Sequence, residues 1–334
     1  MEIIPVFVGM DYHKDTVRVC VLNAAGDVLG NRNCPNDASC VIEYVRRYGD
    51  VRGVAIECCE GTADFAEALI DQTGWPVHLA HPGYVQRMRQ NPDKTDHSDA
   101  RLLADLERVG YLPRVWLAPA AIRELRRLVR YRRQRVNERR NVKLRIRSLL
   151  REHRRVINAP RWGRAWFVWM RCVNLPADSR WILDRHLDRL HQLNEGLQEI
   201  EHRLESVTVD DTLVQQLLKL PGVGPVTAWA LRAEVGRFDR FRSGKQLARF
   251  CGLTPRNASS GARQADAGLI KACNNDLRSV LIEAAHRLKR YDPRWTALAA
   301  KLRAAGKPGS VIAAAVANRW MRWLYHEVRE VKAA

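Results

Sequence analysis

The stretch VFVGMDYHKDTVRVCVLNAAGDVLG, residues 6–30, contains three short runs of apolar and β-branched residues separated by polar turns. We expect strands at residues 6–10, 17–22 and 28–32. Gly26 and Asp27 mark a hairpin turn between the second and third runs. The chain is therefore predicted to begin with a three-stranded meander.

Helices and strands alternate after this meander. We expect helices at residues 40–48, 63–72 and 98–109, and strands at residues 53–56 and 76–80. Gly110 is placed to end the last of these helices. A meander followed by alternating helix and strand is the element order of the α/β ribonuclease-H-like fold, which we predict for residues 1–118.

The rest of the chain has mostly helical patterns. Residues 121–155 form an Arg-rich helical stretch, and residues 178–207 carry a leucine heptad pattern. Between them, Trp162, Trp166 and Trp169 have helical spacing, and we interpret them as packing at the end of a helical hairpin. We predict an Arg-rich helical and coiled-coil region over residues 119–208 and a mostly helical domain over residues 209–334. The heptads favour self-association as a dimer or tetramer, although a hairpin within one chain would use the same pattern.

Charge is distributed unevenly along the chain. The sequence has 56 Lys and Arg against 37 Asp and Glu, a net charge of +19. Residues 1–100 hold 9 basic and 15 acidic residues, a net charge of −6, whereas residues 121–155 hold 15 and 3, a net charge of +12. A strongly basic body favours nucleic acid as the partner, with an anionic membrane surface as the minor alternative. No apolar run is long enough to span a membrane, and we expect a cytoplasmic protein.

The cysteines give no sign of a metal or disulfide framework. The eight of them show no CxxC spacing and stand mostly in apolar runs. We interpret them as reduced thiols in the core.

Four acidic residues stand where the predicted sheet would gather them. Asp11 ends the first strand, Glu57 ends the fourth, and Asp96 and Asp99 open a helix with the i, i+3 spacing that places both on one face. Four converging carboxylates favour Mg²⁺ or Mn²⁺, and two such ions can clamp a phosphodiester. Glu60 competes with Glu57 as the second acid, and Glu57 is preferred because it directly follows the apolar run VAI. Ordinary caps and solvated turns are the alternative interpretation.

These motifs resemble the DEDD transposases of the insertion-sequence one-ten family. The order GMDYHKD, then VAIE with a Gly-Thr turn, then KTDHSDARLLA carries the resemblance, which is more specific at Asp11 and around Asp96 and Asp99 than at Glu57. It implies a RuvC-like catalytic domain and a separate C-terminal transposase domain. It also implies donor and target DNA as substrates, an element-encoded guide RNA, and a location at the bacterial nucleoid.

Two motifs stand in the C-terminal part. KLPGVGPVTAWALRAEVG, residues 219–236, resembles a helix-hairpin-helix, in which Gly222 and Gly224 allow a tight turn whose amides can hold a phosphate. FCGLTPR, followed by a Ser-Gly pair, also resembles the transposase family. The resemblance places the nucleophilic serine of that family at Ser260, with Ser259 as the alternative.

Basic residues near both features are candidates for nucleic-acid contacts. We expect phosphate contacts from Arg256, Arg263 and Lys271 near the serine, and from Arg132, Arg133, Arg139 and Arg140 in the Arg-rich stretch. A serine recombinase is the preferred function. A RuvC-like nuclease or junction resolvase that makes no use of the serine and a non-catalytic nucleic-acid scaffold are the alternatives.

Overall fold

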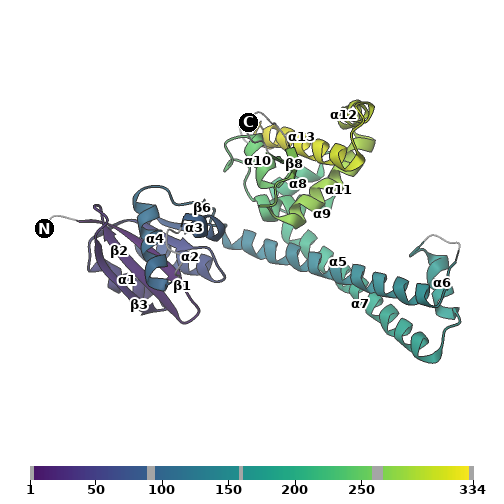
Figure 1. Ribbon diagram of the computed structural model, residues 1–334, viewed down its shortest axis with the longest axis horizontal. Coiled ribbons are helices and arrows are strands. Elements are labelled where there is room, and N and C mark those ends of the chain that lie inside the picture. Colours follow the sequence, from purple (N-terminus) through teal and green to yellow (C-terminus); the bar gives the residue numbers. More distant parts are fainter. Residues whose placement is uncertain (1–3, 89–94, 158–160, 258–265, 331–334) are drawn as a thin grey trace. The chain divides into compact units, whose positions relative to one another are not determined.

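The computed structural model describes residues 4–88, 95–157, 161–257 and 266–330. It divides into two compact units, Met1–Pro119 and Ala120–Ala334 (Figure 1). The Arg-rich helical region and the C-terminal helices belong to the same unit.

The first unit is built on a mixed six-stranded sheet with the order β3-β2-β1-β4-β5-β6. The meander is confirmed, because β1, β2 and β3 pair antiparallel, while β1, β4 and β5 pair parallel. The strands are β1 (Pro5–Tyr12), β2 (Thr16–Asn23), β3 (Val28–Pro35), β4 (Asp50–Glu57), β5 (Val77–Ala80) and β6 (Arg114–Val115). The two-residue β6, antiparallel to β5, has no sequence signal and was not expected.

Helices cover both faces of this sheet. One face packs against α1 (Ala38–Arg46) and α2 (Thr62–Thr73) in a core that includes Val8, Met10 and Ile56. The other packs against α4 (Asp96–Arg108), whose Ala100 and Ala104 lie on Cys20 and Leu22. The short α3 (Pro82–Met88) was also not expected. The first unit is thus α/β, as predicted, and Val85 of α3 joins α4 on this second face.

The second unit begins with a long helical hairpin. Its two arms, α5 (Ala120–Glu152) and α7 (Ala177–Thr208), run side by side, and α6 (Arg164–Cys172) lies at the end of the hairpin (Figure 1). The heptad leucines pack within the chain: Leu183 and Leu190 join Ile146 of α5 in one core. Trp166 is buried in that core, with Trp162 and Trp169 packed against it, so the packing interpretation of the tryptophans is confirmed.

The remaining elements form a compact, mostly helical body. A single core links them, with Trp320, Met321 and Leu324 completely buried. Its elements are α8 (Thr212–Leu218), α9 (Pro225–Ala230), the π-helical segment η1 (Leu231–Val235), α10 (Gly244–Phe250), β7 (Pro255–Asn257), β8 (Asp266–Leu269), α11 (Asn275–Tyr291), α12 (Pro293–Ala304) and α13 (Gly309–Glu330). The small antiparallel pair β7-β8 interrupts what the sequence indicated to be helices.

The cysteine expectation is partly wrong. All eight cysteines are free, and Cys20, Cys34 and Cys251 are buried as expected. Cys40, Cys59 and Cys172 are exposed, because they stand at a helix start, in a turn and on the outer face of α6. Among the described residues, no helix combines the length and apolarity needed to cross a membrane.

Candidate active site

The four candidate carboxylates are set on the side of the sheet that faces α4. Side chains alternate between the faces of a strand, and the face covered by α4 contains Gly9 of β1 and Gly53 and Ala55 of β4. Asp11 and Glu57, two residues further along the same strands, therefore share that face. Asp96 and Asp99 form the first turn of α4. The parallel register, in which Met10 pairs with Ile56, places the two strand ends next to each other.

Gly9 allows α4 to approach the sheet closely. A Cβ atom at this position would lie 2.0 Å from the backbone oxygen of Ala100 and 2.3 Å from the backbone nitrogen of Ala104. Both distances are far inside van der Waals contact, so only glycine fits. Because Ala100 follows Asp99 directly, this contact fixes how near the acidic turn of α4 comes to Asp11.

The start of α4 is held by its own cap and by the sheet. Thr95 is the N-cap, and its side chain and that of Ser98 form a reciprocal capping box. From β3, the Asn31 side chain donates a hydrogen bond to the carbonyl of His97 at 3.1 Å. Arg18 Nε in turn donates to Asn31 Oδ1 at 2.6 Å. The first turn of α4 is thereby fixed relative to three strands.

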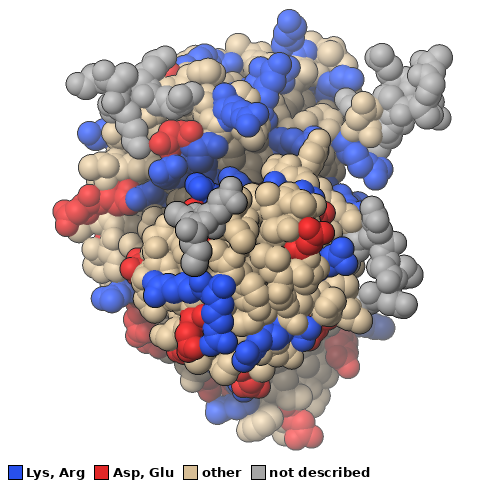
Figure 2. Space-filling view, turned by 90° about the vertical axis from the view of Figure 1, so that its left-hand side faces the viewer, with Lys and Arg blue, Asp and Glu red and all other residues tan. Residues whose placement is uncertain are grey.

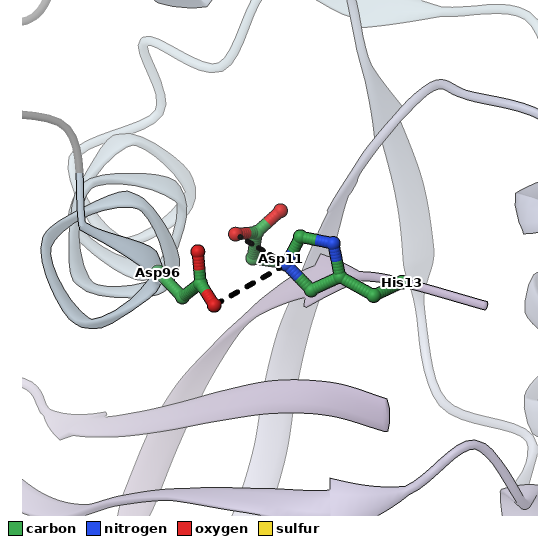
Figure 3. Close-up of side chains that lie close together, drawn as sticks. All are labelled: Asp11, His13 and Asp96. Carbon is green, nitrogen blue, oxygen red and sulfur yellow. Dashed lines mark ion pairs between the residues drawn. The ribbon is translucent and has the colours of Figure 1, made fainter. Parts of the chain in front are cut away.

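His13 stands between two of the acids, and sequence reasoning did not single it out. Its Nε2 lies 3.2 Å from Asp11 Oδ2 and 3.5 Å from Asp96 Oδ2 (Figure 3). One ligand-type atom from each of the three residues lies within 4.8 Å of the others. Asp11 is the enclosed member, with 16% of its side chain exposed, against 45% for His13 and 54% for Asp96. The motif GMDYHKD could have pointed to it, since His13 is only two residues beyond Asp11.

The surroundings of Asp11 disfavour its negative charge. Burial raises the pKa of the Asp11 carboxyl, and the nearby carboxylates of Asp96 and Asp99 raise it further, while His13 acts in the opposite direction. Asp11 Oδ2 is buried and has no hydrogen-bond partner among the described residues, and the His13 ring, with Nε2 3.2 Å away, is its ion-pair partner. Asp11 is held where a cation would relieve an unfavourable charge.

The donor set fits a hard divalent cation. Carboxylate oxygens are the ligands that Mg²⁺ and Mn²⁺ prefer, and the buried Asp11 Oδ2, which lies beside the His13 ring, could coordinate such an ion. The imidazole of His13 is a ligand type more typical of Zn²⁺, Fe, Ni or Cu than of Mg²⁺ or Mn²⁺. Among the described residues, Asp11, Asp96 and His13 bring ligand atoms close enough together for one ion, whereas Glu57 and Asp99 are not part of this group.

Glu57 and Glu60 occupy different surroundings. Glu57 is the last residue of β4, and its charge and that of Asp11 both raise the pKa of the Cys59 thiol, where burial is the largest cause. Glu60 is exposed in the turn that leads into α2, a helix packed on the opposite face. This arrangement favours Glu57 as the acid that faces α4.

The C-terminal candidates lie in the second unit. Gly222 and Gly224 lie between α8 and α9, and Gly222 has a φ of +76°, a conformation that glycine adopts without strain. Arg256 in β7 and Lys271 after β8 are exposed. Ser259, Ser260 and Arg263 lie outside the described residues. The two strands β7 and β8 flank that segment, with Asn257 paired to Asp266.

Three of the four α5 arginines in the prediction have partners within the chain. Arg132 forms an ion pair with Glu201, Arg133 with Asp276, and Arg139 donates a hydrogen bond to Asn194. Arg140 is exposed and has no such contact with any described residue. The proximal arginines therefore fasten α5 to α7 and α11.

Comparison with known proteins identifies the family of this chain. Residues 8–154 match a family model described as a transposase of the DEDD IS110 type, and residues 214–300 match one described as "Transposase IS116/IS110/IS902 family". A "Probable family 20 transposase" of Pseudomonas aeruginosa is 30% identical over 81% of this chain and 82% of its own length. The transposase for insertion sequence element IS1111A of Coxiella burnetii is 25% identical over 85% of this chain and 78% of its own.

A third relative gives the same result. The transposase for insertion sequence element IS1328 of Yersinia enterocolitica is 31% identical over 70% of this chain and 69% of its own length. The first matched region contains all four candidate acids, and the second contains the α8-α9 turn and the segment around Ser260. The chain belongs to the insertion-sequence IS110 family of transposases.

Proposed function

We propose that this transposase cleaves and rejoins DNA strands at a site where Asp11, Glu57, Asp96 and Asp99 hold Mg²⁺ or Mn²⁺. The observation that carries the proposal is the buried Asp11 Oδ2, which has no hydrogen-bond partner among the described residues and faces Asp96 from another element. The bound cation would supply polarisation of the scissile phosphate. The chain contributes rigid placement, because Asp11 and Glu57 are fixed by strands and Asp96 and Asp99 by a capped helix.

The nucleophile in this proposal is Ser260, with Ser259 as the alternative. Its hydroxyl oxygen would attack the scissile phosphorus, forming a phosphoserine ester as a sugar hydroxyl leaves and the serine proton is transferred to solvent or a base. Arg256, Arg263 and Lys271 would bind the oxygens of that phosphate. This role rests on the resemblance of the FCGLTPR and Ser-Gly motifs to the family.

The fold supports an assignment to the RuvC-like, ribonuclease-H-like class. Three antiparallel strands followed by two parallel ones, with the acids at strand ends and a helix start, is the arrangement expected for it. The α8-α9 turn with Gly222 and Gly224 is proposed as a helix-hairpin-helix that contacts DNA backbone.

We also propose a guide RNA and further copies of the chain as partners. An element-encoded RNA would pair with donor and target DNA, so that base pairing selects the sequence while the protein recognises shape and phosphates. The active assembly would be a dimer or tetramer at the bacterial nucleoid. Sequencing the RNA that copurifies with the chain tests the guide, and the absence of any discrete RNA encoded beside the gene would refute it.

The test of the chemistry separates serine attack from metal-dependent hydrolysis. Ser260→Ala and Ser259→Ala are compared with Asp11→Asn on supercoiled donor DNA, with covalent protein–DNA adducts and recombined products as readouts. We expect one serine variant to lose both adduct and recombination, and Asp11→Asn to lose all cleavage. Cleavage without adduct in both serine variants would instead show a nuclease or resolvase, and unchanged behaviour of Asp11→Asn would overturn the acidic site.

A further inference from the structure

The arginines of α5 fall into two groups along the helix. Residues 120–139 contain 8 arginines, and the structure uses most of them to dock α5 onto its neighbours. Arg130 binds Glu234 through two hydrogen bonds of 2.9 and 3.0 Å, and Arg126 donates to the carbonyl of Ala233 at 3.0 Å. The other partnered arginines are Arg127, Arg132, Arg133, Arg135 and Arg139. This group is committed to holding the fold together.

The second group lies at the end of the hairpin. We define the hairpin tip as residues 140–172, which contain 10 Lys and Arg against a single acidic residue, Glu152. Arg140, Arg147 and Arg151 make no hydrogen bond, ion pair or ring contact with any described residue. The same helix thus changes from paired to unpaired arginines beyond Arg139, and its buried residues in the tip are Val142, Ile146 and Leu150.

Four cations of the tip form a row, three of them arginines without a partner among the described residues. Arg140, Lys143, Arg147 and Arg151 follow one another at steps of three and four residues, which places them along one side of α5. At 1.5 Å per residue, this row is about 16 Å long. Burial and the charge of Arg139 lower the pKa of Lys143, so positive charges here repel one another without acidic compensation. Apart from the contact of Lys143 with the Trp162 ring, the row adds repulsion and no contact with a described residue.

Most described tryptophans of this region pack against one another, although Trp181 of α7 is 64% exposed. Trp166 is buried in the core shared by α5, α6 and α7, and Trp162 lies against it with ring centroids 4.4 Å apart. Lys143 Nζ covers the Trp162 ring at 4.7 Å from its centroid. Proteins that bind single strands combine positive charge with exposed aromatic rings, whereas a row of cations without them suits the regular phosphates of a duplex.

We propose that the hairpin tip binds the phosphate backbone of duplex nucleic acid through the row formed by Arg140, Lys143, Arg147 and Arg151. The tip would bind a duplex irrespective of its sequence, through residues distinct from the acidic residues of the first unit. The inference requires only that a transposase engages nucleic acid, and it stands or falls without the serine and metal chemistry proposed above. The occupant is duplex DNA, because the chain belongs to a transposase family, and duplex RNA is an outcome of the test.

The experiment compares two triple variants of the full chain. The test variant is Arg140→Gln, Arg147→Gln and Arg151→Gln. The matched control is Arg127→Gln, Arg185→Gln and Arg189→Gln, which removes the same charge from exposed arginines that pair with Glu124, Asp188 and Glu138. Binding to a DNA duplex, an RNA duplex of the same sequence and the corresponding single strand is measured without divalent cations at several salt concentrations, so no cleavage contributes.

Each lost phosphate contact lowers the slope of log affinity against log salt by about 0.9 for duplex DNA, so the test variant should lower it by about 2.7. Its duplex affinity should fall by about tenfold or more at low salt, while the control changes the slope by less than about 1. Equal losses in both variants would show a nonspecific charge effect and overturn the proposal. A preference of the original chain for the single strand would also overturn the proposal. So would an unchanged salt slope in a test variant whose melting temperature equals that of the original chain. A loss confined to the RNA duplex would overturn duplex DNA as the occupant.

Discussion

At the scale of single residues, the site depends on a glycine as much as on its acids. Gly9→Ala would insert a Cβ atom 2.0 Å from the backbone oxygen of Ala100, and backbone cannot yield as a side-chain end can. We expect the free energy of unfolding of the first unit to fall by about 3 kcal/mol. Metal-dependent cleavage should be lost as Asp96 and Asp99 move away from Asp11. Chemical denaturation and a cleavage assay measure both effects.

Gly196→Ala is the matched control for that change. Gly196 lies inside α7, and a Cβ atom there would meet nothing within 4 Å. Alanine favours a helix over glycine by about 1 kcal/mol, so this variant should be slightly stabilised with cleavage unchanged. A Gly9→Ala protein that kept both stability and cleavage would contradict the close approach of α4.

Replacing Asp11 should raise the thermal stability of the chain without divalent cations and abolish its cleavage of DNA. The pKa of Asp11 is raised in the folded chain by burial and by Asp96 and Asp99, so its charged form destabilises the fold. This unfavourable contribution grows as pH rises through the pKa in the unfolded chain and is complete above the pKa in the folded chain. Without divalent cations, Asp11→Asn should therefore melt at a higher temperature than the original chain near neutral pH.

Added Mg²⁺ or Mn²⁺ should reverse that order. A cation that binds only the folded chain raises its melting temperature, and Asp11→Asn should lose most of this gain. Melting curves with and without each cation, at acidic and neutral pH, make the measurement. Asp64→Asn, a change in the first turn of α2 on the opposite face, serves as the control and should keep the response. An Asp11→Asn protein with an undiminished response to the cation would refute the site.

The sequence was sufficient to locate the acids but not the residues that arrange them. Asp11, Glu57, Asp96 and Asp99 could be singled out because each follows an apolar strand or opens a helix, which are local signals. Asn31 and Arg18 support the start of α4 through contacts across 66 and 13 residues of sequence, respectively. Such contacts depend on strand register, which local patterns do not determine.

At the scale of elements, α5 shows the same limit. Its length and helical nature were predicted to within a few residues, because apolar periodicity is a local property. Which arginines face acids and which face solvent depends on the positions of α7, η1 and α11. The sequence therefore predicted nucleic-acid contacts for Arg132, Arg133 and Arg139, and the structure gives each a partner within the chain. Short elements such as β6 and β7 carry too few residues for a periodic signal.

The docking of α5 onto η1 can be tested through Glu234. This side chain is 10% exposed and binds Arg130, with Arg126 3.6 Å away. Glu234→Gln would leave both arginines without their anion. Because Arg130 is largely exposed and solvent screens its charge, we expect the free energy of unfolding to fall by only about 1–2 kcal/mol. Urea denaturation measures it.

Glu124→Gln is the comparison for Glu234→Gln. Glu124 pairs with Arg127 on the same helix, and both side chains are more than half exposed. Solvent screens such a pair, and its loss should cost less than about 0.5 kcal/mol. Equal effects of the two changes would mean that η1 is not a docking surface for α5.

At the scale of the whole molecule, charge and chemistry are divided between the two units. Residues 1–119 contain 12 Lys and Arg against 17 Asp and Glu, a net charge of −5, and residues 120–334 contain 44 against 20, a net charge of +24. Acidic and basic side chains are nonetheless interspersed over the face shown in Figure 2. The difference in net charge is therefore a sum over each unit and does not show as one charged patch on this face. The unit that holds the candidate metal ligands repels the polyanion on which it would act.

This division predicts how two separate fragments behave. Fragment 1–119 has its own core and all four acids, so it should melt cooperatively and be stabilised by Mg²⁺ or Mn²⁺, yet bind DNA weakly at any salt concentration. Fragment 120–334 should bind duplex DNA with a steep salt dependence and show no thermal response to the cations. Titrations and melting curves of both fragments make the comparison. Strong DNA binding by fragment 1–119 would contradict the division of charge between the units. The predicted result would mean that DNA binding depends on the second unit, because the first unit repels the polyanion.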